Sequence, residues 1–381
     1  MEPSSLTAGL FKLRFKALGT ECLVQFRTAS VEGAKSFRAS ALGWIKDFEI
    51  TWSRFKPESL LSQINAGAGR ESFELNETQE HVLKLCEHTF RFTNGLNDPT
   101  SFPLTMLWDR AAKEDRLPTD AEISETKKLI SWPAVEWGDG KVFLPEKGMA
   151  LEIGGFGKEY AVDQLIALAK QHEIPDVLVD LGRDVATLGQ PPHGPYWVVG
   201  VEDATRDDTP LHRLAFTGKG LATSGNGRRF RTIGGKKFGH IIDARSGAPA
   251  ETDVLTASCL AHDCLTAGLL STNACILGSK EGLKEISRHF GTDAMIQTAD
   301  QTHYTTTIHR HVLLTRLTII IPCLLTSCTV VSTPEERANL STKVMQPERD
   351  PLGAAMSDHM YFSREASHGG NGIGGGGCGC N

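Results

Sequence analysis

Leu151-Glu-Ile-Gly-Gly-Phe-Gly-Lys-Glu-Tyr-Ala-Val-Asp163 is the stretch around which the rest of the chain can be organised. A strand-like start runs into glycines, and the apolar spacing that follows predicts a helix from Gly157 to about His172. Backbone N–H groups at a helix start, together with the helix dipole, favour an anion such as phosphate. The positive charge of Lys158 in the first turn is unfavourable for the bare helix, and a bound anion would explain its presence there. A tight strand–helix turn remains the alternative, because the glycines lack the spacing of a dinucleotide-binding fingerprint.

Helix and strand signals alternate on both sides of this stretch. Apolar residues at helical spacing predict a helix around Phe37 to Phe48, and Thr119-Asp-Ala-Glu122 has the spacing of a capping box. Runs rich in Val and Leu predict strands at 176–181 and 197–201. The pattern predicts a mixed α and β body over residues 1–305.

Composition narrows the class of protein. The 381 residues are 40% apolar and 23% charged, as in an ordinary globular protein, and the net charge of −6 argues against nucleic acid as a partner. The nine cysteines have irregular spacing, so those of the body are expected to be packed thiols. The N-terminus has no signal-peptide pattern, and this sequence therefore predicts a cytoplasmic location.

Three further blocks carry polar groups, and each has two open interpretations. Gly95-Leu-Asn-Asp-Pro-Thr100 is either a turn or the rim of a pocket. In Gly239-His-Ile-Ile-Asp243 the period of two puts His240 and Asp243 on opposite strand faces, so His240 is either structural or acts without that aspartate. Thr272 closes an apolar helical run and either bonds to its own helix or serves a site.

The order and spacing of these blocks together resemble the FAD:protein FMN transferase (ApbE) family over residues 11 to about 300. The blocks that carry the resemblance are Ala17-Leu-Gly-Thr20, the segment from Ser53 to Asn65, the segment from Gly95 to Trp108, Leu151 to Asp163, and Leu221 to Pro249. The resemblance implies a compact α+β fold, with a C-terminal tail that glycine-rich composition predicts to be largely disordered.

The resemblance also implies an activity. Members of this family bind FAD and Mg²⁺, transfer the FMN half through a phosphoester bond to a threonine of a target protein, and release AMP. They are often found on the periplasmic side of the inner membrane. The expected partner is a protein that carries the flavinylation threonine. Hard cations and backbone N–H groups are what a pyrophosphate requires.

Site residues follow from matching the motifs position by position. The residues expected to bind FAD are Leu18, Phe55, Leu96, Asn97, Asp98, Gly154, Gly155, Lys158 and Ile242. Among them, the segment from Gly154 to Lys158 would hold the pyrophosphate. His240 and Asp98 are the expected catalytic groups. The Gly157 carbonyl and the Thr272 hydroxyl are the expected metal ligands.

One departure from the family pattern bears on catalysis. The family's metal block has an aspartate where this chain has Gly268, so a charged ligand is missing. Glu159 replaces a glycine and adds a carboxylate near the glycine turn, which is expected to replace the lost one in part. The alternative hypotheses are a flavin-binding protein without transferase activity, or an enzyme that hydrolyses FAD. Restoring Gly268→Asp is expected to strengthen metal binding.

The C-terminal region reads as a separate unit. Residues 306–330 have the layout of a lipoprotein signal, in which basic residues precede the apolar run from Leu317 to Leu325 and Cys328. Residues 331–381 resemble a short bacterial lipoprotein of unknown function that ends in GGGGCGCN. The apolar run is too short to span a bilayer. Because the lipoprotein-like pattern is confined to this region, any membrane association is expected to occur through the tail only.

Overall fold

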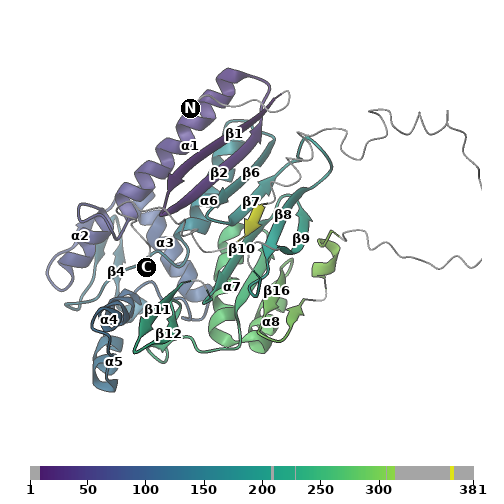
Figure 1. Ribbon diagram of the computed structural model, residues 1–381. Coiled ribbons are helices and arrows are strands. Elements are labelled where there is room, and N and C mark those ends of the chain that lie inside the picture. Colours follow the sequence, from purple (N-terminus) through teal and green to yellow (C-terminus); the bar gives the residue numbers. More distant parts are fainter. Residues whose placement is uncertain (1–8, 207–209, 228, 306, 314–360, 364–381) are drawn as a thin grey trace, which may run out of the picture.

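An eight-stranded antiparallel sheet forms the centre of the computed structural model, which describes residues 9–206, 210–227, 229–305, 307–313 and 361–363 (Figure 1). Its strands, in spatial order, are β1 (Leu10–Ala17), β2 (Thr20–Arg27), β6 (Asp176–Leu181), β7 (Asp184–Leu188), β10 (Gly220–Gly225), β15 (Thr256–Ala261), β16 (Asp293–Gln297) and β17 (Thr302–Tyr304). Strands and helices occupy separate layers, which confirms the predicted α+β class.

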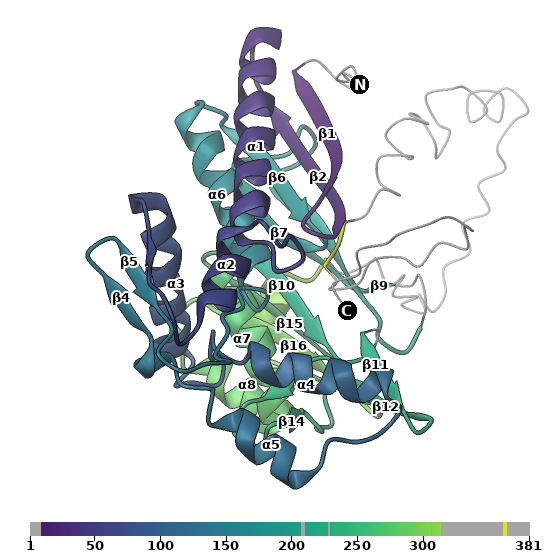
Figure 2. The ribbon, with the colours of Figure 1, turned by 90° about the vertical axis from the view of Figure 1, so that its left-hand side faces the viewer.

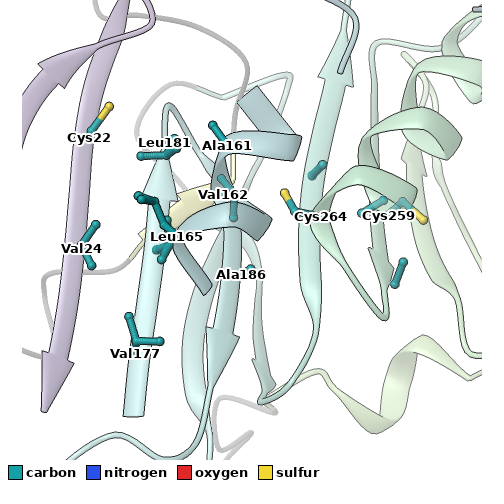
Figure 3. Packing of buried hydrophobic residues seen from close by; sticks show 14 of the residues in the cluster. Cys22, Val24, Ala161, Val162, Leu165, Val177, Leu181, Ala186, Cys259 and Cys264 are labelled. Atoms are coloured by element: carbon teal, nitrogen blue, oxygen red, sulfur yellow. The ribbon is translucent and has the colours of Figure 1, made fainter. Parts of the chain in front are cut away.

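Both faces of this sheet are covered. Helices α1 (Val31–Trp52), α6 (Gly157–Gln171), α7 (Cys264–Leu277) and α8 (Ser279–Ser287) pack on one face, and β8 (Trp197–Glu202) with β9 (Pro210–Phe216) cover the other. In β6, Val177 packs in the cluster under the helices (Figure 3), as does Val179, while Leu178 belongs to the cluster under β8 and β9. A strand buried on both sides has a continuous apolar run, and this explains why β6 could be predicted at its observed bounds.

A second lobe lies beside the end of α1 (Figure 2). Its elements are α2 (Leu60–Gly67), β3 (Phe73–Glu74), α3 (Glu77–Phe92), α4 (Phe102–Lys113), α5 (Asp120–Lys127), η1 (Trp132–Ala134), β4 (Glu136–Gly138) and β5 (Lys141–Phe143). Phe48 and Trp52 of α1 belong to the apolar cluster of this lobe, so the long helix joins the two halves. The capping box predicted at Thr119 is present at the start of α5.

Two small hairpins close the space between the halves. They are β11 (Phe230–Ile233) with β12 (Lys236–Gly239), and β13 (Ile242–Asp243) with β14 (Ala248–Pro249). Trp108 of α4 packs against Phe238, with ring centroids 5.5 Å apart, and donates a hydrogen bond to the carbonyl of Gly247 at 2.9 Å. The hairpins are thereby fixed to the second lobe.

The segment before the glycine turn differs from its prediction. Leu151 to Ile153 form no strand, whereas α6 begins at Gly157 as expected. The Leu151 N–H donates to Asn65 Oδ1 at 2.7 Å, and Asn65 Nδ2 donates to the Leu151 carbonyl at 2.9 Å. One side-chain amide thus takes the place of a neighbouring strand.

The body continues beyond residue 305, where the sequence predicts its end. Ile308, in the short helix η2 (Ile308–Arg310), is 3% exposed within the cluster under β8 and β9. The His311 carbonyl accepts from Ala215 at 2.7 Å, and the Leu313 N–H donates to Arg213 at 2.8 Å. The chain therefore packs against β9 through Leu313.

Little of the tail is described. The backbone of β18 (Tyr361–Ser363) pairs in parallel with β8. The apolar run from Leu317 to Leu325, Cys328 and the glycine-rich end lie outside the described residues. Among the residues that are described, no helix combines the length and apolar character needed to cross a membrane.

Candidate functional site

A cavity of about 340 Å³ opens between the sheet and the second lobe. All of the site residues expected from the sequence line it, namely Leu18, Phe55, Leu96, Asn97, Asp98, Gly154, Gly155, Gly157, Lys158, His240, Ile242 and Thr272. They come from segments spread along most of the chain: the β1–β2 turn, the end of α1, the link between α3 and α4, the glycine turn, the β12–β13 link and α7. The fold thus brings the separate blocks together at one site.

The glycine turn presents backbone at the cavity wall. Phe156 precedes α6 without a side-chain cap, and the Gly157 N–H donates to the carbonyl of Ile153 at 2.7 Å. A Cβ on Gly154 would lie 2.7 Å from Glu152 Oε1, so a side chain there would require a shift. Gly154 and Gly155 are exposed within the cavity lining, which leaves room for a ligand to approach the backbone.

Lys158 has a carboxylate partner. Its Nζ lies 2.6 Å from Oδ2 of Asp184, and the two side chains are 13% and 1% exposed. Asp184 is the first residue of β7. The charge of Lys158 in the first turn of α6 is therefore balanced from the sheet.

Asp98 is held in a turn. Its Oδ1 accepts from the Thr100 N–H at 2.8 Å and from Thr100 Oγ1 at 2.6 Å, and its Oδ2 accepts from the Trp132 N–H at 3.2 Å. The side chain is buried. These contacts fit the turn interpretation and a positioning role better than the expected catalytic one, because both carboxylate oxygens are already engaged.

His240 lies in the link between β12 and β13 and is half-buried. Its Nδ1 donates to the carbonyl of Arg229 at 3.3 Å, which makes Nε2 the basic nitrogen of the neutral ring. Asp243 instead binds Arg245 at 2.8 Å. His240 and Ile241 lie between two strands, so the argument from strand faces does not apply to His240.

Charged residues at one end of the cavity were not predicted. Arg54 Nη1 lies 2.8 Å from Glu152 Oε1, with side chains 13% and 18% exposed. The Arg54 guanidinium also stacks over Phe55, at 4.7 Å from the ring centroid. Burial raises the pKa of the Glu152 carboxyl, while the charge of Arg54 opposes the rise. Arg54 and Glu152 lie inside matched blocks, but nothing local in the sequence shows that they meet.

The expected metal end of the site contains oxygen atoms. Thr272 Oγ1 lies 2.9 Å from Ser224 Oγ, which also contacts Ser271 Oγ at 2.8 Å. Within the described part of the chain, no three His, Cys, Asp or Glu side chains gather into a metal cluster. The Glu159 side chain fills the space in front of Gly268, where an aspartate was expected. Hydroxyl, carbonyl and carboxylate oxygens suit Mg²⁺, which takes few protein ligands and keeps several waters.

An α+β body with a cavity between its two halves is typical of proteins that bind small molecules, and the comparisons with known proteins specify the family. The ApbE family model matches residues 18–296, so the chain belongs to the ApbE family. A second model, described as a domain of unknown function (DUF4266), matches residues 333–381, which fits a separate tail.

Relatives and solved structures agree with this assignment. The FAD:protein FMN transferase of Klebsiella pneumoniae (strain 342) is 25% identical over 260 residues, which cover 68% of this chain and 80% of the relative. The FAD:protein FMN transferase of Vibrio cholerae serotype O1 is 25% identical over 272 residues, covering 70% and 81%. The ApbE protein of Thermotoga maritima superposes with a TM-score of 0.71 at 26% identity, covering 79% of this chain and 99% of that one. The flavin transferase ApbE from Vibrio cholerae gives 0.69 at 19% identity, covering 80% and 100%.

Proposed function

We propose that this protein transfers the FMN half of FAD to a threonine hydroxyl of a target protein and releases AMP, in a reaction that depends on Mg²⁺. The observation that carries the proposal is the meeting of all the matched blocks in one cavity. The names of the relatives, FAD:protein FMN transferase, support it.

The bonds that form and break in this transfer require a group in the site that accepts a proton. The threonine oxygen forms a bond to the FMN phosphorus, the bond between that phosphorus and the bridging oxygen breaks, and AMP leaves with the bonding electrons. The threonine proton must reach a base. His240 lines the cavity with Nε2 as its basic nitrogen, so it is our candidate for that acceptor.

The remaining residues bind and orient. The start of α6 has no side-chain cap, and the positive end of its dipole would stabilise the pyrophosphate charge. Apolar walls from Phe48, Trp52 and Leu96 suit the ring systems of FAD. When bound, Mg²⁺ would neutralise charge on the phosphates, and we propose that Gly157 and Thr272, which line the cavity, would hold it.

Mass spectrometry tests the proposal directly. The full chain is incubated with FAD, Mg²⁺ and a peptide that contains Ser-Gly-Ala-Thr, with the same peptide carrying alanine for threonine as the control. We expect a mass increase of one FMN on the threonine peptide only, and an equal amount of AMP. Replacing His240 by alanine is expected to slow transfer by about 10²-fold or more.

Two competing functions have distinct outcomes. The absence of an aspartate at position 268 favours a flavin-binding protein without transferase activity, which would bind FAD and modify neither peptide. Release of FMN and AMP while neither peptide is modified would instead identify FAD hydrolysis. Either result would refute the transfer that we propose.

We further propose that the C-terminal unit is lipoprotein-like and that any membrane association arises through it. The match of residues 333–381 to a separate family model supports an independent unit. Partition of the full chain, but not of a chain ending at Leu313, into lipid vesicles would be the expected result.

A further inference from the structure

The layer formed by β8 and β9 has two edges, and the C-terminal part of the chain pairs with both. At the β9 edge, the Leu313 N–H donates to the carbonyl of Arg213 at 2.8 Å. At the β8 edge, the backbone of β18 (Tyr361–Ser363), yellow in Figure 1, pairs in parallel with residues 199–201. The chain therefore leaves the body along one side of this layer and meets it again along the other.

β8 offers a fixed edge to an added strand. Trp197, Val199 and Val201 are buried in the cluster between this layer and the central sheet, which holds β8 in place. One edge of β8 pairs with β9, and the other faces β18. A strand at the edge of a sheet presents backbone N–H and carbonyl groups with which an extended segment can pair. A hairpin of two strands also gains stability from a third strand.

The C-terminal unit is the occupant that fits this edge. Residues 361–363 fall inside the stretch 333–381, which matches a family model separate from that of the body. The distance from the segment at the β9 edge to β18 is three strand spacings, or roughly 14 Å. Residues 314–360 provide far more chain than this distance requires. A single chain can therefore occupy both edges of the layer.

We propose that the outer edge of β8 is a strand-addition site, and that its occupant is the segment Tyr361–Ser363 of the same chain. The C-terminal unit is then docked on the ApbE body rather than only tethered to it. The affinity of such a contact comes from main-chain hydrogen bonds. No residue of β8 is among those that line the cavity, so the docking does not depend on the proposed transfer of FMN.

Hydrogen exchange of the full chain, read at single amides by mass spectrometry, tests the docking. The N–H groups of a strand point alternately to its two sides, so the β8 amides that do not face β9 are protected only if another strand covers them. A variant with Tyr361→Pro, Phe362→Pro and Ser363→Pro has no N–H in this segment to donate to β8. The outer amides of β8 should exchange at least about tenfold faster in this variant, while those that face β9 should not change.

Two controls make the test specific. Prolines at Ala354, Ala355 and Met356 place the same number of substitutions outside the paired segment, and the outer amides of β8 should then exchange as in the wild type. A synthetic peptide of residues 357–367, added to the triple-proline variant at about 1 mM, should restore slow exchange, because a tether provides an effective concentration of that order. The same peptide with proline at positions 361–363 should restore nothing.

The possible outcomes are distinct. Equal exchange of the outer β8 amides in the wild type and the triple-proline variant would refute the docking, as would a wild-type peptide that restores nothing. Slow exchange that is lost when the wild type is diluted would show that a second copy supplies the strand, and docking within one chain would be wrong. Transfer of FMN is measured separately on the same proteins, so its failure would leave the docking intact.

Discussion

Ion pairs set the electrostatic character of the cavity wall at the scale of single residues. Three cations that line the cavity each have a carboxylate partner, and the pairs are Arg54 with Glu152 at 2.8 Å, Arg231 with Asp109 at 2.6 Å, and Lys158 with Asp184 at 2.6 Å. The wall is therefore polar without a large net charge from these groups. An anionic ligand would meet oriented backbone and paired cations, which need little rearrangement on binding.

The Arg54–Glu152 pair gives a prediction. Arg54→Ala leaves Glu152 largely buried without its cation and removes the group stacked on Phe55. We expect a loss of up to about 3 kcal/mol in the free energy of unfolding, measured by urea denaturation, and weaker FAD binding, measured by flavin fluorescence. The double variant Arg54→Ala/Glu152→Ala should regain part of the stability, because the isolated charge is gone. A double variant less stable than the single one would contradict this account.

At the scale of elements, local sequence patterns are sufficient to predict some of the helices and strands. The doubly buried strand β6 and the helix α6 could be predicted because burial on known faces gives a run or a period in the sequence. The members of the cavity could be predicted as a set because the matched blocks resemble one family in their order and spacing, and the fold brings these blocks together. The individual contacts could not, since the pairing of Arg54 with Glu152 and of Glu159 with Gly268 depends on how distant elements pack. The missing strand at Leu151 has the same cause: Asn65 satisfies its backbone from another helix.

The last element of the body gives a second prediction. A chain ending at Thr305 lacks Ile308, which is 3% exposed, and the hydrogen bonds from 311 and 313 to β9. We expect it to be less stable than a chain ending at Leu313 by at least about 2 kcal/mol, the value of one buried Ile side chain. Thermal melts of the two chains measure the difference. Equal melting temperatures would show that the segment after residue 305 adds no stability.

At the scale of the whole molecule, the cavity exists only in the complete fold. Its lining runs from Leu18 to Ile276 and draws on the sheet, the helical layer, the second lobe and the hairpins. A loss of global stability is therefore also a loss of the site. Conditions that change the free energy of unfolding should change the fraction of protein able to bind flavin.

The pH is such a condition. Burial raises the pKa of Asp163 and that of Asp180 to about 7, from an ordinary value near 4. Both groups favour the folded state when protonated, so their contribution is complete below about pH 4 and is lost as the pH rises through 7. We expect the melting temperature to fall between pH 5 and pH 8.5. Asp180→Asn keeps an acceptor for the Arg183 N–H and should flatten this dependence. A wild-type melting temperature that rises over this interval would contradict the prediction.

The contact between Gly268 and Glu159 also constrains how such a protein can change over generations. A side chain at position 268 fits only if Glu159 moves or is replaced by a smaller residue, since a Cβ there would lie 2.5 Å from Glu159 Cγ. Position 268 is therefore restricted to glycine for as long as position 159 carries a glutamate in this conformation. A substitution at one position is coupled in this way to a substitution at the other.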